Sequence, residues 1–301
     1  MPSNPADLQE AKEGKLYLVA TPIGNLSDIT LRALETLRSV DMIAAEDTRR
    51  TRKLLSHFEI HKPTVSYREH NARTCGSYLL GKIASGKSVA LVTDAGTPCI
   101  SDPGNLLVEM ALERGIEPVA IPGPTALISA LIVSGLDTHP FVFLGFPPSK
   151  GAERRRFFEK NAKVDMTLIL YESPMRLEKT LRDMADNWGD RKVAVARELT
   201  KMYEEVFRGS ISEALSHFAG EARGEIVLVV DGAAPGEKIS DDPGDSSQSP
   251  PWKEELEALL SGGLSSKEAA QAVACRFDLP RRMIYQAALE IKKSGRNFSE
   301  K

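Results

Sequence analysis

The chain has 301 residues, enough for about two domains that each bury a core of their own. Its 39 Lys and Arg against 42 Asp and Glu give a net charge of −3, which excludes a protein that binds a polyanion with its whole surface. Three cysteines without C-x-x-C spacing argue against a disulfide framework or a cysteine zinc site. No signal-like segment or run of ~20 apolar residues occurs, so we expect a cytoplasmic protein.

After an N-terminal extension (1–14), short apolar runs alternate with amphipathic stretches, which is typical of a sheet covered by helices. The runs are unbroken, as in strands of a mostly parallel sheet that are buried on both faces. We predict strands at 16–20, 40–46, 64–67, 88–93 and 117–122. We predict helices at 30–38, 48–56, 71–85, 103–114 and 124–134. A first α/β domain is therefore expected at 15–135.

A second α/β domain is expected at 136–232, where the alternation begins again after a turn-rich segment. Strands are predicted at 141–146, 166–172, 192–198, 203–210 and 224–232. No helix fits between 198 and 203, so these two strands should form a hairpin in a mixed sheet.

The last part of the chain differs in composition from the two domains. Residues 233–250 are rich in Pro, Gly, Ser and acids and read as a flexible acidic linker. A helical domain follows at 251–301, in which Ser265 and Glu268 form a capping-box pattern and DLP (278–280) a turn. It resembles a small helix-turn-helix unit, used either on nucleic acid or as a helical hairpin that packs on the body or in a dimer.

One nucleotide-binding motif is misleading. Residues 81–88, GKIASGKS, satisfy the phosphate-loop pattern, but a phosphate loop follows a strand and precedes a helix. Here a helix precedes it and a strand follows, so we interpret Gly86 as a helix C-cap. No G-x-G-x-x-G follows a predicted strand, which leaves nicotinamide enzymes without support.

Glycine and proline instead gather in three loops at the carboxyl ends of strands, at 20–26, 93–104 and 121–126. Open α/β sheets place their ligand crevices at this edge, so we expect the three loops to meet in one site. The loop TDAGTPCISDPG (93–104) carries most of the polar groups. We expect Asp102 to be largely structural, as the N-cap of a helix that begins at Pro103.

Seven motifs in order, VATPIGNLSDIT, AAEDTR, TDAGTPCISDPG, IPGPTA, LGFPP, YESPMR and ARELTK, resemble the tetrapyrrole methylase superfamily. Within it, roughly residues 15–232 resemble the ribosomal RNA small subunit methyltransferase I family. The resemblance implies a homodimer with S-adenosylmethionine bound between two domains. It also implies methylation of the ribose 2′-hydroxyl of a decoding-centre cytidine in 16S rRNA, on free rRNA or on the small ribosomal subunit.

By this resemblance, one set of residues is expected to bind the cofactor: Ile23, Asp94, Gly96, Thr97, Ile100, Thr125, Ala126, Tyr171, Leu199 and Ile226. For some of the apolar ones the alternative is plain core packing. A group that takes the proton of the acceptor hydroxyl would assist catalysis, and our candidates are Asp47, Glu198 and Lys201. The alternative for these three is a structural salt bridge.

Cations concentrate in two clusters despite the net acidity, and each adjoins a motif loop. We expect RNA phosphates to contact Arg49, Arg50, Arg52, Lys53, Lys150, Arg154, Arg155 and Arg156. Arg176 either holds a phosphate or clamps Glu172 internally. The histidine spacing indicates no metal site. Two rival functions stay open: a superfamily methyltransferase acting on a tetrapyrrole, corrinoid or other small molecule, and a non-enzymatic RNA-binding ribosome-assembly factor.

Overall fold

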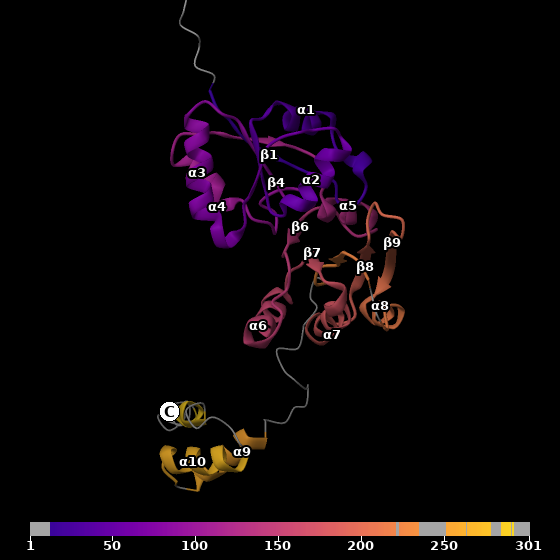
Figure 1. Cartoon of the computed structure of the whole chain (residues 1–301). Coiled ribbons are helices and arrows are strands. Elements are labelled where there is room, and N and C mark those ends of the chain that lie inside the picture. The colour runs from indigo at the N-terminus through magenta and orange to yellow at the C-terminus, as the bar shows by residue number, and fades with distance from the viewer. Residues whose placement is uncertain are drawn as a thin grey trace, which may run out of the picture. The chain divides into compact units, whose positions relative to one another are not determined.

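The computed structural model describes residues 13–220, 223–234, 251–262, 264–277, 284–289 and 291. The chain divides into two compact units, 1–239 and 240–301. The larger unit, here called the body, contains two five-stranded sheets (Figure 1). The first lobe (13–125) carries the first sheet, and the second lobe (126–220 and 223–234) carries the second.

Every strand pair in the first sheet is parallel, in the order β3-β2-β4-β1-β5. The strands are β1 (Leu16–Val19), β2 (Met42–Ala45), β3 (Thr64–Ser66), β4 (Val89–Val92) and β5 (Pro118–Ile121). The central strand β4 is buried along its whole length. Such a strand has apolar side chains toward both faces, which is why its sequence reads VALV without alternation.

Helices cover both faces of the first sheet (Figure 1). They are α1 (Leu31–Ser39), α2 (Thr48–His57), α3 (Ala72–Ala84) and α4 (Asn105–Leu112). Leu79 of α3 and Leu107 of α4 pack in one core cluster, whereas Leu37 of α1 and Leu55 of α2 pack in another. The amphipathic stretches between the strands thus close the sheet on both sides and leave its carboxyl edge for the loops.

The second sheet is mixed, in the order β6-β7-β10-β8-β9, with β6 and β7 parallel and the other pairs antiparallel. The strands are β6 (Phe141–Phe143), β7 (Thr167–Glu172), β8 (Lys192–Arg197), β9 (Glu205–Ser210) and β10 (Ile226–Val230). The helices are α5 (Ala126–Val133), α6 (Gly151–Asn161), α7 (Leu177–Trp188) and α8 (Ile211–His217). Helix α5 packs on β7 and β10, while the other three share a core with the same sheet.

The predicted fold class is confirmed, including the mixed second sheet and the hairpin of β8 and β9. Residues 81–88 run from the end of α3 toward β4, which confirms that they are no phosphate loop. The predicted helix start at Pro103 is wrong. Helix α4 begins at Asn105, because Gly104 takes the N-cap position with φ of +153° and Asp102 lies outside the helix.

Helix α8 was not predicted. It has seven residues, too few to show a clear helical period, but the reciprocal capping box of Ser210 and Glu213 marks its start. None of the helices in the described ranges has the length and apolarity that a membrane crossing needs.

The smaller unit contains α9 (Pro251–Ser261), α10 (Ser266–Phe277) and a helical segment at 284–289. Leu256, Val273 and Ile284 are fully buried in its own core. The predicted capping box is confirmed, since Ser265 and Glu268 exchange hydrogen bonds between side chain and backbone. The turn at 278–280, most of the linker (235–250) and most of the N-terminal extension (1–12) lie outside the described residues.

Candidate functional site

The loops at the carboxyl edge of the first sheet are tied to one another through the main chain. The N–H groups of Thr21 and Gly96 donate to each other's carbonyls at 2.8 and 2.9 Å. The Thr97 hydroxyl donates to the Pro124 carbonyl at 3.2 Å, which joins the loops after β4 and β5. The Asp47 N–H donates to Asp94 Oδ1 at 3.0 Å and adds the loop after β2. The prediction that three loops meet is confirmed, and a fourth joins them.

These loops contain backbone conformations that side chains rarely adopt. Gly96 has φ of +81°, and the non-glycine residues Cys99 and Ser101 have φ of +70° and +62°. In the second lobe, Glu198 and Thr200 have φ of +52° and +67°. Such conformations cost free energy and concentrate where a protein must present groups to a ligand. The two strained segments therefore mark the loops around one site.

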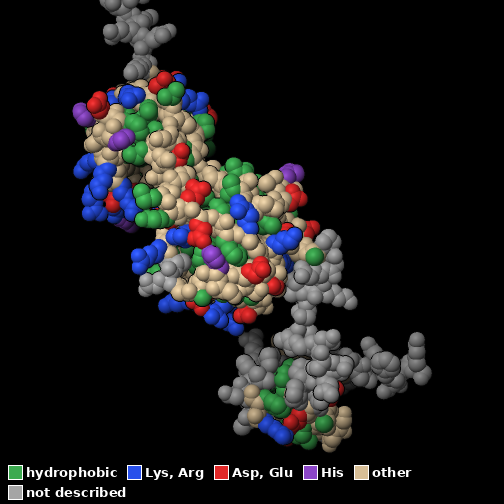
Figure 2. Space-filling view, turned by 90° about the vertical axis from the view of Figure 1, so that its right-hand side faces the viewer, with side chains coloured by type: hydrophobic (Ala, Val, Ile, Leu, Met, Phe, Trp, Pro, Cys, Tyr) green, Lys and Arg blue, Asp and Glu red, His purple; other side chains and the backbone are tan. Residues whose placement is uncertain are grey.

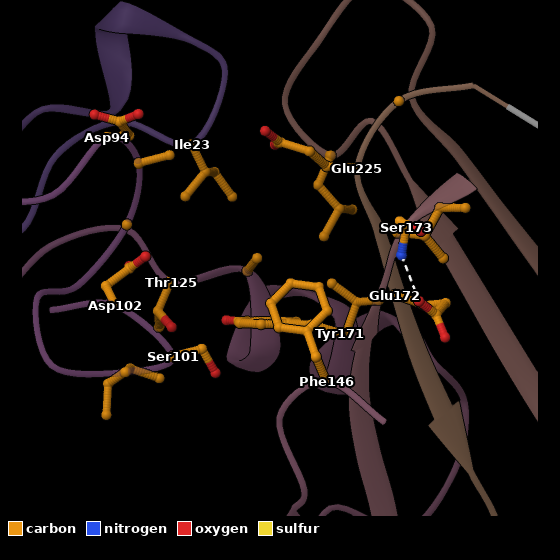
Figure 3. A pocket seen from close by; sticks show the side chains of 18 of the residues that line it. Ile23, Asp94, Ser101, Asp102, Thr125, Phe146, Tyr171, Glu172, Ser173 and Glu225 are labelled. Atoms are coloured by element: carbon orange, nitrogen blue, oxygen red, sulfur yellow. Dashed lines mark hydrogen bonds between the residues drawn. The ribbon is translucent and has the colours of Figure 1, made fainter. Parts of the chain in front are cut away.

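A cavity of about 410 Å³ lies between the two lobes, within the range of small-molecule sites. Residues from both lobes line it, as Figure 3 shows for several side chains. All ten residues predicted to bind the cofactor are among them: Ile23, Asp94, Gly96, Thr97, Ile100, Thr125, Ala126, Tyr171, Leu199 and Ile226. The structure brings this set together although its members come from six separate segments of the sequence.

Five carboxylates line the cavity, and their partners differ. Arg50 pairs with Asp94 at 3.3 Å, Arg176 with Glu172 at 2.7 Å and Lys201 with Glu225 at 3.2 Å. Glu46 accepts a hydrogen bond from the Thr93 hydroxyl. Within the described ranges no salt bridge forms at Glu46 or at Asp102. Burial raises the pKa of Asp102 to about 6, Thr93 opposes the rise by a hydrogen bond, and the charges of Glu46 and Asp94 add to it.

Two aromatic rings stand in the cavity. Tyr171, near the end of β7, packs edge-on against Phe143, and Phe146 lies 5.5 Å from Tyr171 between ring centroids. Burial raises the pKa of Tyr171, so its hydroxyl stays protonated, while hydrogen bonds with Leu127 and Thr125 oppose the rise. Figure 3 shows both rings between the side chains of the first lobe and those at the end of β7.

Behind the rings, the second lobe contains a buried network of charges. Glu172 binds the Thr180 hydroxyl as well as Arg176. The Arg154 guanidinium donates to Thr180 at 2.9 Å and to Asp183 at 2.6 Å. Each buried charge thus has a partner of opposite sign and further hydrogen bonds, as buried ions require. The network fixes the end of β7 and the start of α7.

The three predicted proton acceptors do not line the cavity. Asp47 caps α2 and pairs with Arg49, whose hydrogen bonds lower the pKa of Asp47 to about 2. Glu198 and Lys201 pair with each other at 2.7 Å, which lowers the pKa of Glu198. These side chains form the structural salt bridges that were the alternative interpretation. Their catalytic role stays a prediction that this geometry does not favour.

Most of the predicted phosphate contacts are exposed: Arg49, Arg50, Arg52, Lys53, Lys150, Arg155 and Arg156. Figure 2 shows Lys and Arg side chains gathered on part of the surface of the first lobe. Arg154 does not fit the prediction, because its side chain is 4% exposed and its donors serve Asp183, Thr180 and the Pro148 carbonyl. For Arg176, the structure confirms the second of the two predicted alternatives, an internal ion pair with Glu172.

Several lining residues were missed by sequence reasoning, among them Glu46, Phe146, Glu172, Glu225 and Val227. Phe146 had a signal, since it stands in the LGFPP motif beside two prolines. Asp102 was interpreted as structural because S-D-P is a common helix start. No group of three or more His, Cys, Asp and Glu side chains arranged to hold a metal occurs in the described part of the chain.

Comparisons with known proteins agree with this geometry. Residues 15–215 match the family of tetrapyrrole (corrin/porphyrin) methylases. The chain is 48% identical over 284 residues to the ribosomal RNA small subunit methyltransferase I of Synechocystis, covering 94% of this chain and 100% of that protein. The protein of the same name from Thermotoga maritima is 50% identical over 220 residues, 73% of this chain and 99% of its own.

Among solved structures, a diphthine synthase matches with a TM-score of 0.58 and 17% identity, covering 72% of this chain and 90% of that one. At this identity the likeness shows the fold alone. The close relatives carry the finer assignment, because they match through both lobes and nearly their full length. The chain therefore belongs to the tetrapyrrole methylase family and, within it, to the ribosomal RNA small subunit methyltransferase I family.

Proposed function

We propose that this protein transfers the methyl group of S-adenosylmethionine to the ribose 2′-hydroxyl of a cytidine in the decoding centre of 16S rRNA. One observation carries the proposal: the ten residues predicted to bind the methyl donor line a single cavity, in a chain whose close relatives are named for methylation of small-subunit rRNA. We also propose that the protein acts as a homodimer, as the family resemblance implies, and that it acts in the cytoplasm.

The chemistry of the cavity fits this donor. When bound, S-adenosylmethionine supplies a methyl group on a positively charged sulfur. Apolar side chains such as Ile23 and Ile226 offer a sleeve for its uncharged parts, and polar residues of the first-lobe loops, such as Asp94 and Thr97, line the cavity beside them for its polar ends. The unpaired Asp102 and the neighbouring Glu46 complement a cation. A lining that holds five carboxylates would disfavour an anionic ligand.

We assign the role of proton acceptor to Asp102. A carboxylate with a pKa near 6 is ionised at neutral pH and is a stronger base than the ion-paired Asp47 or Glu198. With the donor bound, its methyl group would replace the proton of the ribose hydroxyl, and Asp102 would accept that proton and release it to water. Most of the rate enhancement comes from holding donor and acceptor about 3–3.5 Å apart and aligned.

RNA reaches the cavity along the exposed cations of the two lobes. Arg52 and Lys53 lie on α2, and Lys150 and Arg155 lie at the start of α6. The α2 cations follow the loop after β2, near the lining residue Glu46, and the α6 cations follow the loop that contains the lining residue Phe146. An RNA backbone bound to both groups of cations would therefore pass the mouth of the cavity. The C-terminal helical unit is proposed to add a further RNA contact.

The test is methyl transfer from labelled S-adenosylmethionine to small ribosomal subunits and to free 16S rRNA from cells that lack this protein. Label at the 2′-oxygen of a decoding-centre cytidine is the expected result, with the Gly96→Val variant as the inactive control. Label elsewhere on the RNA would refute the target. No transfer to RNA, with transfer to a tetrapyrrole or corrinoid, would refute the substrate class. Equal transfer by a variant without residues 251–301 would refute the role of the helical unit.

A further inference from the structure

Phe146 is an apolar residue of the cavity lining whose ring is exposed to solvent. Its side chain is 52% exposed, although it lines the cavity. Its ring inclines at 58° to that of Tyr171. Exposed aromatic rings in the lining of a largely apolar cavity are typical of surfaces that a ligand covers. The ligand that covers this ring must offer a flat apolar face.

The main chain on both sides of Phe146 is fixed. The Gly145 carbonyl accepts a hydrogen bond from the Tyr171 N–H at 3.0 Å, and Gly145 has φ of +66°. The Pro147 carbonyl accepts from Arg176 at 3.3 Å, and the Pro148 carbonyl accepts from Arg154 at 2.8 Å. Both arginines belong to the buried charge network. The ring is thus presented by a loop that is already ordered, so little conformational entropy is lost when a ligand packs on it.

The surroundings of the loop favour a nucleotide of the RNA over the methyl donor as this ligand. Lys150 and Arg155 follow the loop by a few residues, are exposed and are available for phosphates. The ring and these cations together match the two parts of a nucleotide, a flat base and an anionic backbone. The first-lobe side chains expected to bind the donor, such as Asp94 and Thr125, lie to the left of the Phe146 ring in Figure 3.

We propose that the Phe146 side chain stacks on the base of the target nucleotide, and that the carbonyl clamps from Arg154 and Arg176 hold the ring in place for this purpose. The inference rests on the proposed function and deepens it, because it assigns a positioning residue for the acceptor. Stacking tolerates any base, so the ring would orient the nucleotide while other groups select cytidine.

The test removes the ring and the base separately and together. Methyl transfer by the intact protein and by Phe146→Ala is measured on two RNA substrates, one with the natural target nucleotide and one with an abasic ribose that keeps the 2′-hydroxyl. Phe146→Trp serves as the conservative variant. Leu112→Ala, which shortens a 49% exposed apolar side chain on α4, serves as the matched control.

We expect Phe146→Ala to lower kcat/KM on the natural substrate by about tenfold to a hundredfold, the usual cost of losing one stacked base. On the abasic substrate the same variant should match the intact protein, because the stacking partner is already gone. Phe146→Trp should retain activity, and the affinity for S-adenosylmethionine measured by calorimetry should not change.

Three results would overturn the inference. An equal loss on both substrates would mean that the ring does not contact the base. A loss of affinity for S-adenosylmethionine would assign the ring to the donor. Unchanged kcat/KM on the natural substrate would leave the ring without a role. In each case the proposed function survives if the intact protein methylates the RNA, whereas its failure to methylate any RNA refutes both proposals.

Discussion

The two lobes build their halves of the cavity in different ways. In the first lobe the loops are joined by main-chain groups, as in the paired hydrogen bonds of Thr21 and Gly96. In the second lobe the wall is fixed by side chains, through the buried charges of Glu172, Arg176 and Arg154. The first arrangement depends on backbone conformation, and the second depends on the identity of a few ionised residues.

This difference predicts where each half is vulnerable. A loop held by its main chain tolerates new side chains except where the backbone has positive φ or approaches a ligand. A buried charge network tolerates almost no loss, because removing one member leaves its partner charged and unpaired. Substitutions in the first lobe should therefore affect ligand binding, and substitutions in the network should affect folding.

The largest effect is expected at Glu172. Glu172→Ala strands the Arg176 guanidinium and should lower the free energy of unfolding by about 3–5 kcal/mol. Urea unfolding followed by circular dichroism measures it. Glu178→Ala is the matched control, since Glu178 and Arg182 form a pair with the same spacing on the surface and should change stability by about 0.5 kcal/mol or less. Equal effects at both positions would contradict the comparison.

The next effect is expected at Gly96 and concerns binding. Gly96→Val places a β-branched residue at φ of +81° and should weaken binding of S-adenosylmethionine by about a hundredfold or more. Isothermal calorimetry measures the affinity, and circular dichroism checks that the fold is retained. In the control Gly81→Ala the added methyl meets no atom within 4 Å, so binding should be unchanged. Tight binding by Gly96→Val would remove this loop from the donor site.

Asp102 should combine a stability cost with a catalytic gain. The pKa of Asp102 is about 6 in the folded protein, above its ordinary value of 3.8. Ionisation of Asp102 is therefore less favourable in the folded protein than in the unfolded chain, and the free energy of unfolding falls as the pH rises from about 4 to 6. Asp102→Asn should therefore be more stable than the intact protein by about 1–2 kcal/mol at pH 7, and this advantage should vanish below pH 4. Thermal unfolding at the two pH values provides the measurement.

The same variant should be a poor methyltransferase, because Asn cannot accept the proton. In the intact protein, kcat/KM should fall as the pH is lowered through about 6, where Asp102 becomes protonated. An Asp102→Asn variant with full activity and an unchanged pH profile would show that another group takes the proton.

The smallest effect is expected at Arg155, which is exposed next to the buried Arg154. Arg155→Ala should change the free energy of unfolding by no more than about 0.5 kcal/mol. It should weaken RNA binding equally for every RNA sequence, and the slope of log affinity against log salt concentration should fall by about 1, the loss of one phosphate contact. Binding titrations at several salt concentrations measure this. Unchanged affinity and salt dependence would exclude Arg155 from the RNA path.

Much of the fold was predictable because its signals are local. Unbroken apolar runs such as VALV identify buried parallel strands, and the loops follow from the edge at which parallel strands end. The prediction that ten residues form one donor site came from the family motifs, since no periodicity or spacing in the sequence relates Ile23 to Tyr171.

The rest depends on contacts that the sequence does not encode locally. Nothing near Arg154 indicates that it is buried on Asp183, 29 residues further along the chain, while its neighbour Arg155 is exposed. Asp102 was misread because a common helix-start pattern competed with the positive φ of Gly104, which delays the helix. The raised pKa of Asp102 arises from burial, from Glu46 on another segment and from Asp94 at the other end of the same loop, so only the folded arrangement reveals it.

The order of the strands along the chain also determines which lobe can fold first during synthesis. All five strands of the first sheet lie before residue 122, so that lobe can fold while the remainder is still being translated. The second sheet cannot, because β10 is its middle strand and the last to be made, and β7 and β8 both need it as a hydrogen-bonding partner. A chain truncated before Ile226 should contain a folded first lobe and an unfolded, aggregation-prone second lobe. A chain truncated after residue 234 keeps β10, so both of its lobes should fold.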